Sequence, residues 1–223
     1  MESPLNEKTR STLIAKRGYR QDIVGDTLAL YLSNNPMAAQ WLANRIGDPS
    51  KVLLELCCAV GVTMEYLAPV FDKVIGIDID RQALEACKDN LQKAGVSENS
   101  ILIQGNVSNK EILKNVKADI VIYDIPYWYP DKYFQYTAEE RNVENPDLVT
   151  LVADIRKYIS EDIVIFAPPE MGYKYFSSVL GECEVVQVYI NQKHDRNYIF
   201  LGNLIKEEGE GIITLSLAIL NND

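Results

Sequence analysis

The chain has 223 residues, a formal net charge of −10 at pH 7 and an isoelectric point near 4.7. This length suits one α/β domain. The excess of acids argues against a protein whose whole surface binds nucleic acid. The longest apolar runs fall short of the ~18 residues that a membrane span needs, and the N-terminus is charged where a signal peptide is apolar. A cytoplasmic protein without a membrane contact is expected.

The first twenty residues differ in charge from the rest of the chain. Basic residues outnumber acidic ones there, with Lys8, Arg10, Lys16, Arg17 and Arg20 against Glu2 and Glu7. The excess leaves two alternatives, which are a patch that contacts the phosphates of RNA and an ordinary solvated helix. Residues 1–35 are interpreted as an N-terminal helical segment that precedes the main domain.

Strand and helix patterns alternate from residue 36 onward. A helix is predicted to begin at Pro36, with Asn35 as its cap and Gly47 at its exit, and the apolar run 51–61 then predicts a buried strand. The same alternation continues through helix 62–71, strand 73–80, helix 81–95, strand 100–106, helix 108–116 and strand 118–124. A capping box from Ser108 to Glu111 is expected to open the third of these helices.

The second half closes the sheet in a different way. A helix over 145–160, capped by Asn145, leads to a strand over 161–170 and a helix over 171–181. Residues 183–205 then form two strand-like runs around a polar turn that contains His194, which predicts a hairpin with the histidine in its loop. The later run 212–220 either extends the sheet or contacts another subunit. Together the elements predict a mostly parallel sheet with helices on both faces.

The four cysteines do not predict a metal site. Cys57, Cys58, Cys87 and Cys183 lack C-x-x-C spacing, and a single histidine excludes a multi-histidine site. Buried free thiols are therefore expected, with no metal and no disulfide framework.

Polar residues follow four of the predicted strands. Ligands of open parallel sheets bind outside the carboxyl ends of the strands, so these residues are the candidates for a binding site. Glu55 ends the first strand, and the turn from Ala59 to Gly61 is expected to offer backbone amides to a ligand. The next three strands end at or just before Asp78, Asn106 and Asp124.

The residue types at these ends describe a nucleoside pocket. A carboxylate at Asp78 can accept both hydroxyls of a ribose, and the amide of Asn106 can contact an adenine edge. The chain has neither G-x-G-x-x-G nor a P-loop, which disfavours NAD and ATP because their phosphates need such loops. S-adenosylmethionine carries a ribose and an adenine without phosphate and is the cofactor that fits best.

With these residues in view, the chain resembles the class I S-adenosylmethionine-dependent methyltransferases, and is most similar to the RNA cap guanine-N2 methyltransferase family, the trimethylguanosine synthase group. The first motif of that family has the form D-x-x-C-G-V-G-G, which "ELCCAVGV" matches at Glu55, Cys58, Val60 and Gly61. Ala59 and Val62 replace two of its glycines, a departure that bears on cofactor affinity.

The fourth motif of the family, S-P-P-W-G-G-P-D-Y, carries the second part of the resemblance. The segment "DIPYWYPDK" keeps Pro126, an aromatic at Tyr127, Pro130 and Asp131, and "LGNLI" at 201–205 resembles the family's terminal F-G-D-L-I. Asp124 replaces the serine of the motif, which moves the segment toward the [DNS]-P-P-[YFW] pattern of enzymes that methylate amino groups on planar bases.

The resemblance implies a fold and a set of site residues. It implies a Rossmann-like methyltransferase three-layer sandwich with a seven-stranded sheet and an antiparallel C-terminal hairpin, in which 36–205 is the methyltransferase domain and 206–223 a C-terminal extension with an extra strand. The cofactor site is expected at Glu55, Cys57, Ala59, Gly61, Asp78, Ile79, Asn106, Val107 and Asp124.

The segment after Asp124 is the expected acceptor site. Asp124 and the carbonyl of Ile125 would accept hydrogens from an amine, Pro126 would stiffen the turn and Tyr127 would stack on a base, with Trp128 and Tyr129 completing the platform. The opposing interpretation is that these rings fill the core beneath a loop.

The expected function is methylation of an amino nitrogen, in first place that of a guanine in RNA. Two alternatives stay open, which are methylation of a small amine or a protein side chain, and a non-catalytic scaffold of the same fold. The sequence leaves the oligomeric state open.

Overall fold

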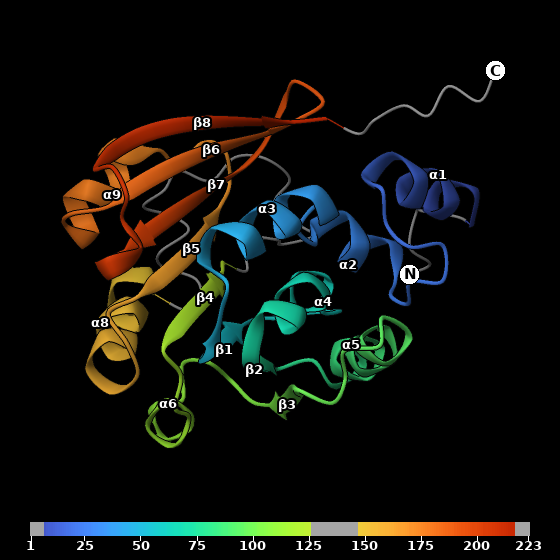
Figure 1. Cartoon of the computed structure of the whole chain (residues 1–223), viewed down its shortest axis with the longest axis horizontal. Helices are drawn as coiled ribbons and strands as arrows, with labels where there is room; N and C mark the ends of the chain where they lie inside the picture. Colours follow the sequence, from blue (N-terminus) through green and yellow to red (C-terminus); the bar gives the residue numbers. More distant parts are fainter. Residues whose placement is uncertain (1–6, 126–146, 217–223) are drawn as a thin grey trace.

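The computed structural model describes residues 7–125 and 147–216, and within them one sheet of eight strands in the order β3-β2-β1-β4-β5-β7-β6-β8 (Figure 1). Five neighbouring strands are parallel, and β7 lies antiparallel between β5 and β6. The strands are β1 Asp48–Leu56, β2 Phe71–Asp78, β3 Ser100–Gln104, β4 Ile120–Asp124, β5 Ile163–Ala167, β6 Glu184–Ile190, β7 Lys193–Leu201 and β8 Gly209–Leu215.

The mostly parallel sheet and the hairpin β6–β7 confirm the predicted fold class, whereas the expected number of strands was wrong. The run 212–220, which the sequence left unplaced, begins within β8: its residues 212–215 belong to this strand, and 217–220 lie outside the described residues. β8 pairs in parallel with β6 over Glu184–Ile190 and makes the eighth strand. Alternating exposed and half-buried residues in β8 explain why its pattern differs from that of a central strand.

Helices cover both faces of the sheet. One face carries α6 Lys110–Asn115, α8 Leu148–Tyr158 and α9 Tyr173–Leu180, which share a core with Leu54, Tyr123 and Ile165. The other face carries α3 Pro36–Ile46, α4 Val62–Leu67 and α5 Arg81–Lys93, packed on Leu53, Ile122 and Phe166. Successive strand residues point to opposite faces, so the two cores together give the three layers expected.

Three helix boundaries differ from the sequence pattern. Asn109, rather than Ser108, caps α6 by accepting a hydrogen bond from the amide of Glu111, and Asp147, rather than Asn145, caps α8 by accepting from the amide of Thr150. The predicted helix 62–71 ends early, because Pro69 lies in a 3-10 turn, Ala68–Val70, that leads into β2. Several residues near each start can cap, and sequence alone does not rank them.

His194 lies in β7 and not in the turn, which corrects its predicted loop placement. The turn consists of Asn191 and Gln192, both with positive φ (49° and 67°), and is shorter than the polar run suggests. The His194 ring stacks on Tyr189 at 4.7 Å between centroids, and its Nε2 lies 2.8 Å from Oδ1 of Asn197.

The N-terminal helices α1 Glu7–Arg17 and α2 Thr27–Leu32 pack against the domain. Ile14, Tyr19 and Leu30 share a cluster with Val60 and Val62, which belong to the turn after β1 and the start of α4. Buried Asn90 of α5 ties this arrangement together, because its Nδ2 donates to the carbonyls of both Val24 (2.8 Å) and Val60 (2.9 Å).

All four cysteines are free thiols; Cys57 is half-buried and the other three are buried. Among the helices within 7–125 and 147–216, none has the length and apolar character that crossing a bilayer requires.

Candidate functional site

The turn after β1 has an unusual backbone. Cys57, Ala59 and Gly61 have φ values of 62°, 46° and 79°, in the left-handed region that side chains disfavour. Gly61 has a second constraint, because a Cβ there would lie 2.4 Å from Sγ of Cys87 on α5. The glycine therefore allows both the turn and the close approach of α5, whereas Ala59 adopts the same region with a side chain.

Four amides of this turn are bonded within the protein, whereas the contact of Ala59 and Gly61 with a cofactor stays a prediction. The amides of Cys57 and Cys58 donate to the carbonyl of Ile77 at 2.8 and 3.2 Å, and that of Gly61 donates to Cys58 at 2.9 Å. The amide of Ala59 donates to Oδ2 of Asp78 at 2.8 Å. The bonds from Cys57, Cys58 and Ala59 hold the turn against the end of β2, and the bond from Gly61 closes the turn on itself. Those four amides therefore do not form a phosphate cradle.

Asp78 is fixed at the end of β2. Its Oδ2 accepts from Ala59 and its Oδ1 accepts from the amide of Asp80 at 2.9 Å. Burial raises the pKa of Asp78, and the backbone hydrogen bonds oppose that rise. Each carboxylate oxygen has a second lone pair for a ligand hydroxyl. Ile79, the next residue, exposes 65% of its surface, which is unusual for so apolar a side chain.

Glu55 is the most deeply buried acid of the group. Only 2% of it is exposed, and its Oε2 has no hydrogen-bond partner within the described part of the chain. Burial, with the negative charge of Asp124 next, raises the pKa of Glu55 well above its ordinary value, while a hydrogen bond from Thr63 works against the rise. An unsatisfied buried oxygen is costly and marks the position as one that a ligand or water completes.

Asp124 ends β4, directly beside β5. Its side chain is 21% exposed, and its Oδ2 lies 3.7 Å from Nη1 of Arg196 on β7. Burial raises the pKa of Asp124 to about 6; the charge of Arg196 opposes the rise, and Asp195 and Asp78 add to it. Sequence reasoning missed Arg196, although a basic residue entering an apolar strand, "DRNYIFL", is a signal that deserved weight.

The third strand contributes less clearly. Asn106 is exposed and its Oδ1 accepts from the amide of Ser108 at 2.8 Å, while Val107 is buried. The contact between Asn106 and an adenine edge stays a prediction. Pro126, Tyr127, Trp128 and Tyr129, the expected acceptor segment, lie outside the described residues.

The ionisable groups at this edge of the sheet are mostly acids, of which Glu55 is the one whose buried carboxyl favours the protonated form. Glu55, Asp78, Asp124 and Asp195 interact electrostatically with one another or with Arg196, the guanidinium among them. In the described ranges, no group of three or more histidines, cysteines or acids could hold a metal ion. A surface of this sign attracts a cationic ligand and repels a polyphosphate.

The basic N-terminal residues are largely engaged with the protein. Arg17 pairs with Asp195 at 3.3 Å, and Arg20 forms two hydrogen bonds to the Glu65 carboxylate at 3.0 and 3.1 Å. Lys16 is exposed. These ion pairs show how α1 and the segment after it are attached, and the predicted phosphate contact stays a prediction.

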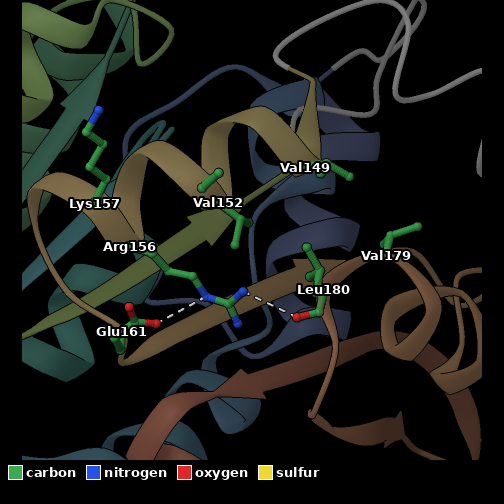
Figure 2. A pocket seen from close by; sticks show the side chains of 8 residues that line it. Val149, Val152, Arg156, Lys157, Glu161, Val179 and Leu180 are labelled. Carbon is green, nitrogen blue, oxygen red and sulfur yellow. Dashed lines mark hydrogen bonds and ion pairs between the residues drawn. The ribbon is translucent and has the colours of Figure 1, made fainter.

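A separate hollow of about 390 Å³ lies between α8 and α9. In Figure 2, Arg156 reaches from α8 to the carboxylate of Glu161 and to the carbonyl of Leu180. Glu161 lies two residues before the start of β5, so the hollow lies near the amino ends of the strands. It is therefore distinct from the acidic edge.

With this geometry established, known proteins provide a comparison. A family model described as RNA cap guanine-N2 methyltransferase matches residues 50–203, more than half of the chain. The chain belongs to this family. The resemblance inferred from the two motifs is thereby confirmed, and the cofactor of the family is S-adenosylmethionine.

The two relatives described next match a smaller part of the chain than the family model does. The chain is 36% identical over 107 residues to the ribosomal protein L11 methyltransferase of Hamiltonella defensa, covering 46% of this chain and 33% of the relative. It is 27% identical over 106 residues to the rRNA N6-adenosine-methyltransferase metl-5 of Caenorhabditis elegans, covering 45% and 50%. The chain thus spans a third to a half of these relatives.

Solved structures support the fold. A candidate methyltransferase of Porphyromonas gingivalis W83 superposes with a TM-score of 0.67 and 14% identity, over 83% of this chain and 44% of that one. At this identity the likeness concerns the fold alone.

The acidic edge fits S-adenosylmethionine. Glu55 has an unsatisfied buried oxygen, Asp78 presents a fixed carboxylate, and the negative field suits a cofactor that carries a sulfonium and an ammonium group. The engaged amides of the turn argue against a pyrophosphate. Asp78 and Glu55 are the residues expected to hold the cofactor.

Replacing Glu55 by glutamine is expected to flatten the pH dependence of stability. A raised folded-state pKa means that the protonated carboxyl stabilises the fold fully below the unfolded pKa of about 4.3, and that this stabilisation is lost as pH rises through the folded value. Each unit of separation corresponds to about 1.4 kcal/mol in the free energy of unfolding. Melting temperatures from pH 4 to 8 measure the difference.

Glu85→Gln is the matched control, because Glu85 is exposed and pairs with exposed Arg81 within α5. Its curve should follow that of the wild type. Parallel curves for Glu55→Gln and the wild type would show that the buried carboxyl does not govern this dependence.

Proposed function

We propose that the protein transfers a methyl group from S-adenosylmethionine to an amino nitrogen of a nucleobase in RNA, with the N2 of guanine as the first candidate. The observation that carries the proposal is the meeting of Glu55, Asp78 and Asp124 at one edge of the sheet, within a family whose model is that of an RNA cap guanine-N2 methyltransferase. S-adenosylmethionine supplies an electrophilic methyl group on a sulfonium.

The residues of the chain would contribute orientation and polarity. The lone pair of an exocyclic amine is delocalised into its ring, so the nitrogen must be oriented and its hydrogens accepted for it to attack. Asp124 is proposed to accept a hydrogen bond from one N–H group of the amine. The carbonyl of Ile125 would accept a hydrogen bond from the second N–H group, because Ile125 follows Asp124 directly at the end of β4.

The acceptor would reach Asp124 from the side of the segment that follows it. Pro126 is proposed to stiffen the turn, Tyr127 to stack on the base, and Trp128 and Tyr129 to extend the stacking surface. A base stacked on an aromatic ring gains ~1–3 kcal/mol whatever its identity. Selection of guanine must therefore come from polar contacts, with Asp124 as the first candidate.

A second candidate is methylation of a protein amine. The relative from Hamiltonella defensa is by its name a methyltransferase of a ribosomal protein, and the net charge of −10 favours a basic protein substrate over a polyanion. The same carboxylate could accept hydrogens from either kind of amine, so the site geometry leaves the choice to experiment.

Incubation with methyl-labelled S-adenosylmethionine and separated cellular RNA and protein decides between the candidates. Label is expected in RNA, and nuclease digestion should place it on a guanine. RNA binding should weaken steeply between 50 and 200 mM salt if phosphates are contacted. Label confined to ribosomal protein would support the second candidate, and a protein that binds the cofactor but labels nothing would contradict both.

A further inference from the structure

Arg196 is a charged side chain on the inner strand β7 with only 3% of its side chain exposed. Its Nη1 lies 3.7 Å from Asp124, its Nε donates to Asp195 at 3.2 Å, and its Nη2 donates to the carbonyls of Leu32 and Ser33, each at 3.1 Å. The guanidinium is thus held from three directions and is too deeply buried to be a surface group.

The side chains packed around Arg196 do not account for a charged residue at this position. Across the ladder it faces Val188 of β6, which is fully buried, and its guanidinium carbon lies 5.9 Å from the Phe166 ring. An aliphatic residue would suit such a strand position, and burying an ion pair seldom adds stability relative to apolar packing. The arginine is therefore better explained by what it does to Asp124.

We propose that Arg196 is a positioning residue that fixes the orientation of the Asp124 carboxylate and keeps it ionised for the acceptor amine. The proposal rests on the function proposed for Asp124 and adds the residue on which that function depends. Arg196 itself touches neither cofactor nor substrate in this account. It acts through the carboxylate.

The N-terminal segment helps to hold Arg196 in its position. Arg17 donates to the Ser33 carbonyl at 2.7 Å and pairs with Asp195 at 3.3 Å, and the Tyr19 hydroxyl donates to the Leu30 carbonyl at 2.8 Å. Asp195 and Ser33 are both partners of Arg196. Residues before position 36 thus hold the arginine in place, which assigns them a role in the site besides any contact with RNA.

The charges that face Asp124 determine the effect expected from removing the arginine. Asp195 lies on β7 and Asp78 at the end of β2; these acids disfavour a negative charge at Asp124, and Arg196 favours it. The charge of Asp124 in turn raises the pKa of buried Glu55 in β1. A cation at this range lowers the pKa of a carboxyl group by about 1–3 units. Without Arg196, the ionisation of Asp124 should therefore occur at higher pH.

Arg196→Met tests the proposal, with Arg196→Lys as the conservative variant. In Arg196→Met the acid limb of the kcat profile for methyl transfer should move upward by about one to two pH units, and kcat at pH 7 should fall by about two- to tenfold. The KM for S-adenosylmethionine should stay within about threefold. Arg196→Lys keeps the charge and should restore the position of the acid limb but only part of kcat, because an ammonium lacks the planar fork.

Arg45→Met is the matched control. Arg45 forms an ion pair of similar burial with Glu184 at 2.7 Å, and Glu184 begins β6 at the opposite edge of the sheet. Its loss should lower the melting temperature without moving the pH profile. If Arg196→Met does not fold, the pH profile and kcat of Arg196→Lys decide.

The outcomes separate the two proposals. A wild-type kcat and pH profile in both Arg196 variants, together with an inactive Asp124→Ala, would overturn the role of Arg196 and leave the proposed function standing. Full activity of Asp124→Ala would instead overturn the role of Asp124 itself. An equal shift of the profile in Arg45→Met would show that the effect is one of stability alone.

Discussion

Replacing Asp124 by alanine is expected to lower the rate of methyl transfer by about 10²- to 10³-fold while binding of S-adenosylmethionine changes by less than about tenfold. The size is that of losing one preorganised group that stabilises developing charge. Asp124 is the proposed acceptor of a hydrogen bond from the amine, and it is the acid among the described residues at the end of β4. Single-turnover rates with labelled cofactor, together with calorimetric affinities, separate the two effects.

The fold should survive this replacement. Arg196 keeps Asp195 and the carbonyls of Leu32 and Ser33 as partners when Asp124 is lost. Glu184→Ala, which breaks the buried ion pair with Arg45 far from the site, should lower stability but preserve the rate per folded molecule. Wild-type turnover in Asp124→Ala would exclude the carboxylate from the reaction.

Replacing Asp78 by alanine is expected to weaken the binding of S-adenosylmethionine by about 100-fold or more. Hydrogen bonds to a charged group contribute about 1.5–3 kcal/mol each, and the proposed contact with ribose involves two hydroxyls. The change also removes the acceptor for the Ala59 amide and so loosens a turn whose backbone is in the left-handed region. Calorimetric titration with the cofactor measures the loss.

Asp80→Ala provides the control for Asp78. Asp80 lies two residues further on and caps α5 by accepting from the amides of Gln82 and Ala83. Its removal should cost about 0.5–2 kcal/mol of stability and leave cofactor affinity unchanged. If the two variants lose affinity equally, the effect comes from a disturbed α5 and not from a ribose contact.

Much of the architecture follows from the sequence because its signals are local. The apolar run before Glu55 and the acid after "KVIGI" mark parallel strands and their carboxyl ends, and the sheet rule then brings these ends to one edge. Asn35 and Pro36 predict the start of α3 correctly because the cap and the first-turn proline specify the same boundary.

The sequence does not predict those features of the site that depend on contacts between residues far apart along the chain. Whether the amides of Cys57, Cys58 and Ala59 are free depends on β2, because Ile77 accepts from the first two and Asp78 accepts from the third. The proximity of Arg196 to Asp124 can be recognised only once β7 is placed beside β5. This antiparallel pairing brings the start of β7 to the carboxyl end of β5. No local pattern contains that pairing.

The most direct test of the account is calorimetric titration of the wild-type protein with S-adenosylmethionine and, separately, with NAD. The acidic edge with its engaged amides predicts one saturable site for S-adenosylmethionine and no measurable heat with NAD. Absence of both heat and thermal stabilisation with S-adenosylmethionine, or tighter binding of NAD, would contradict the assignment of this edge of the sheet.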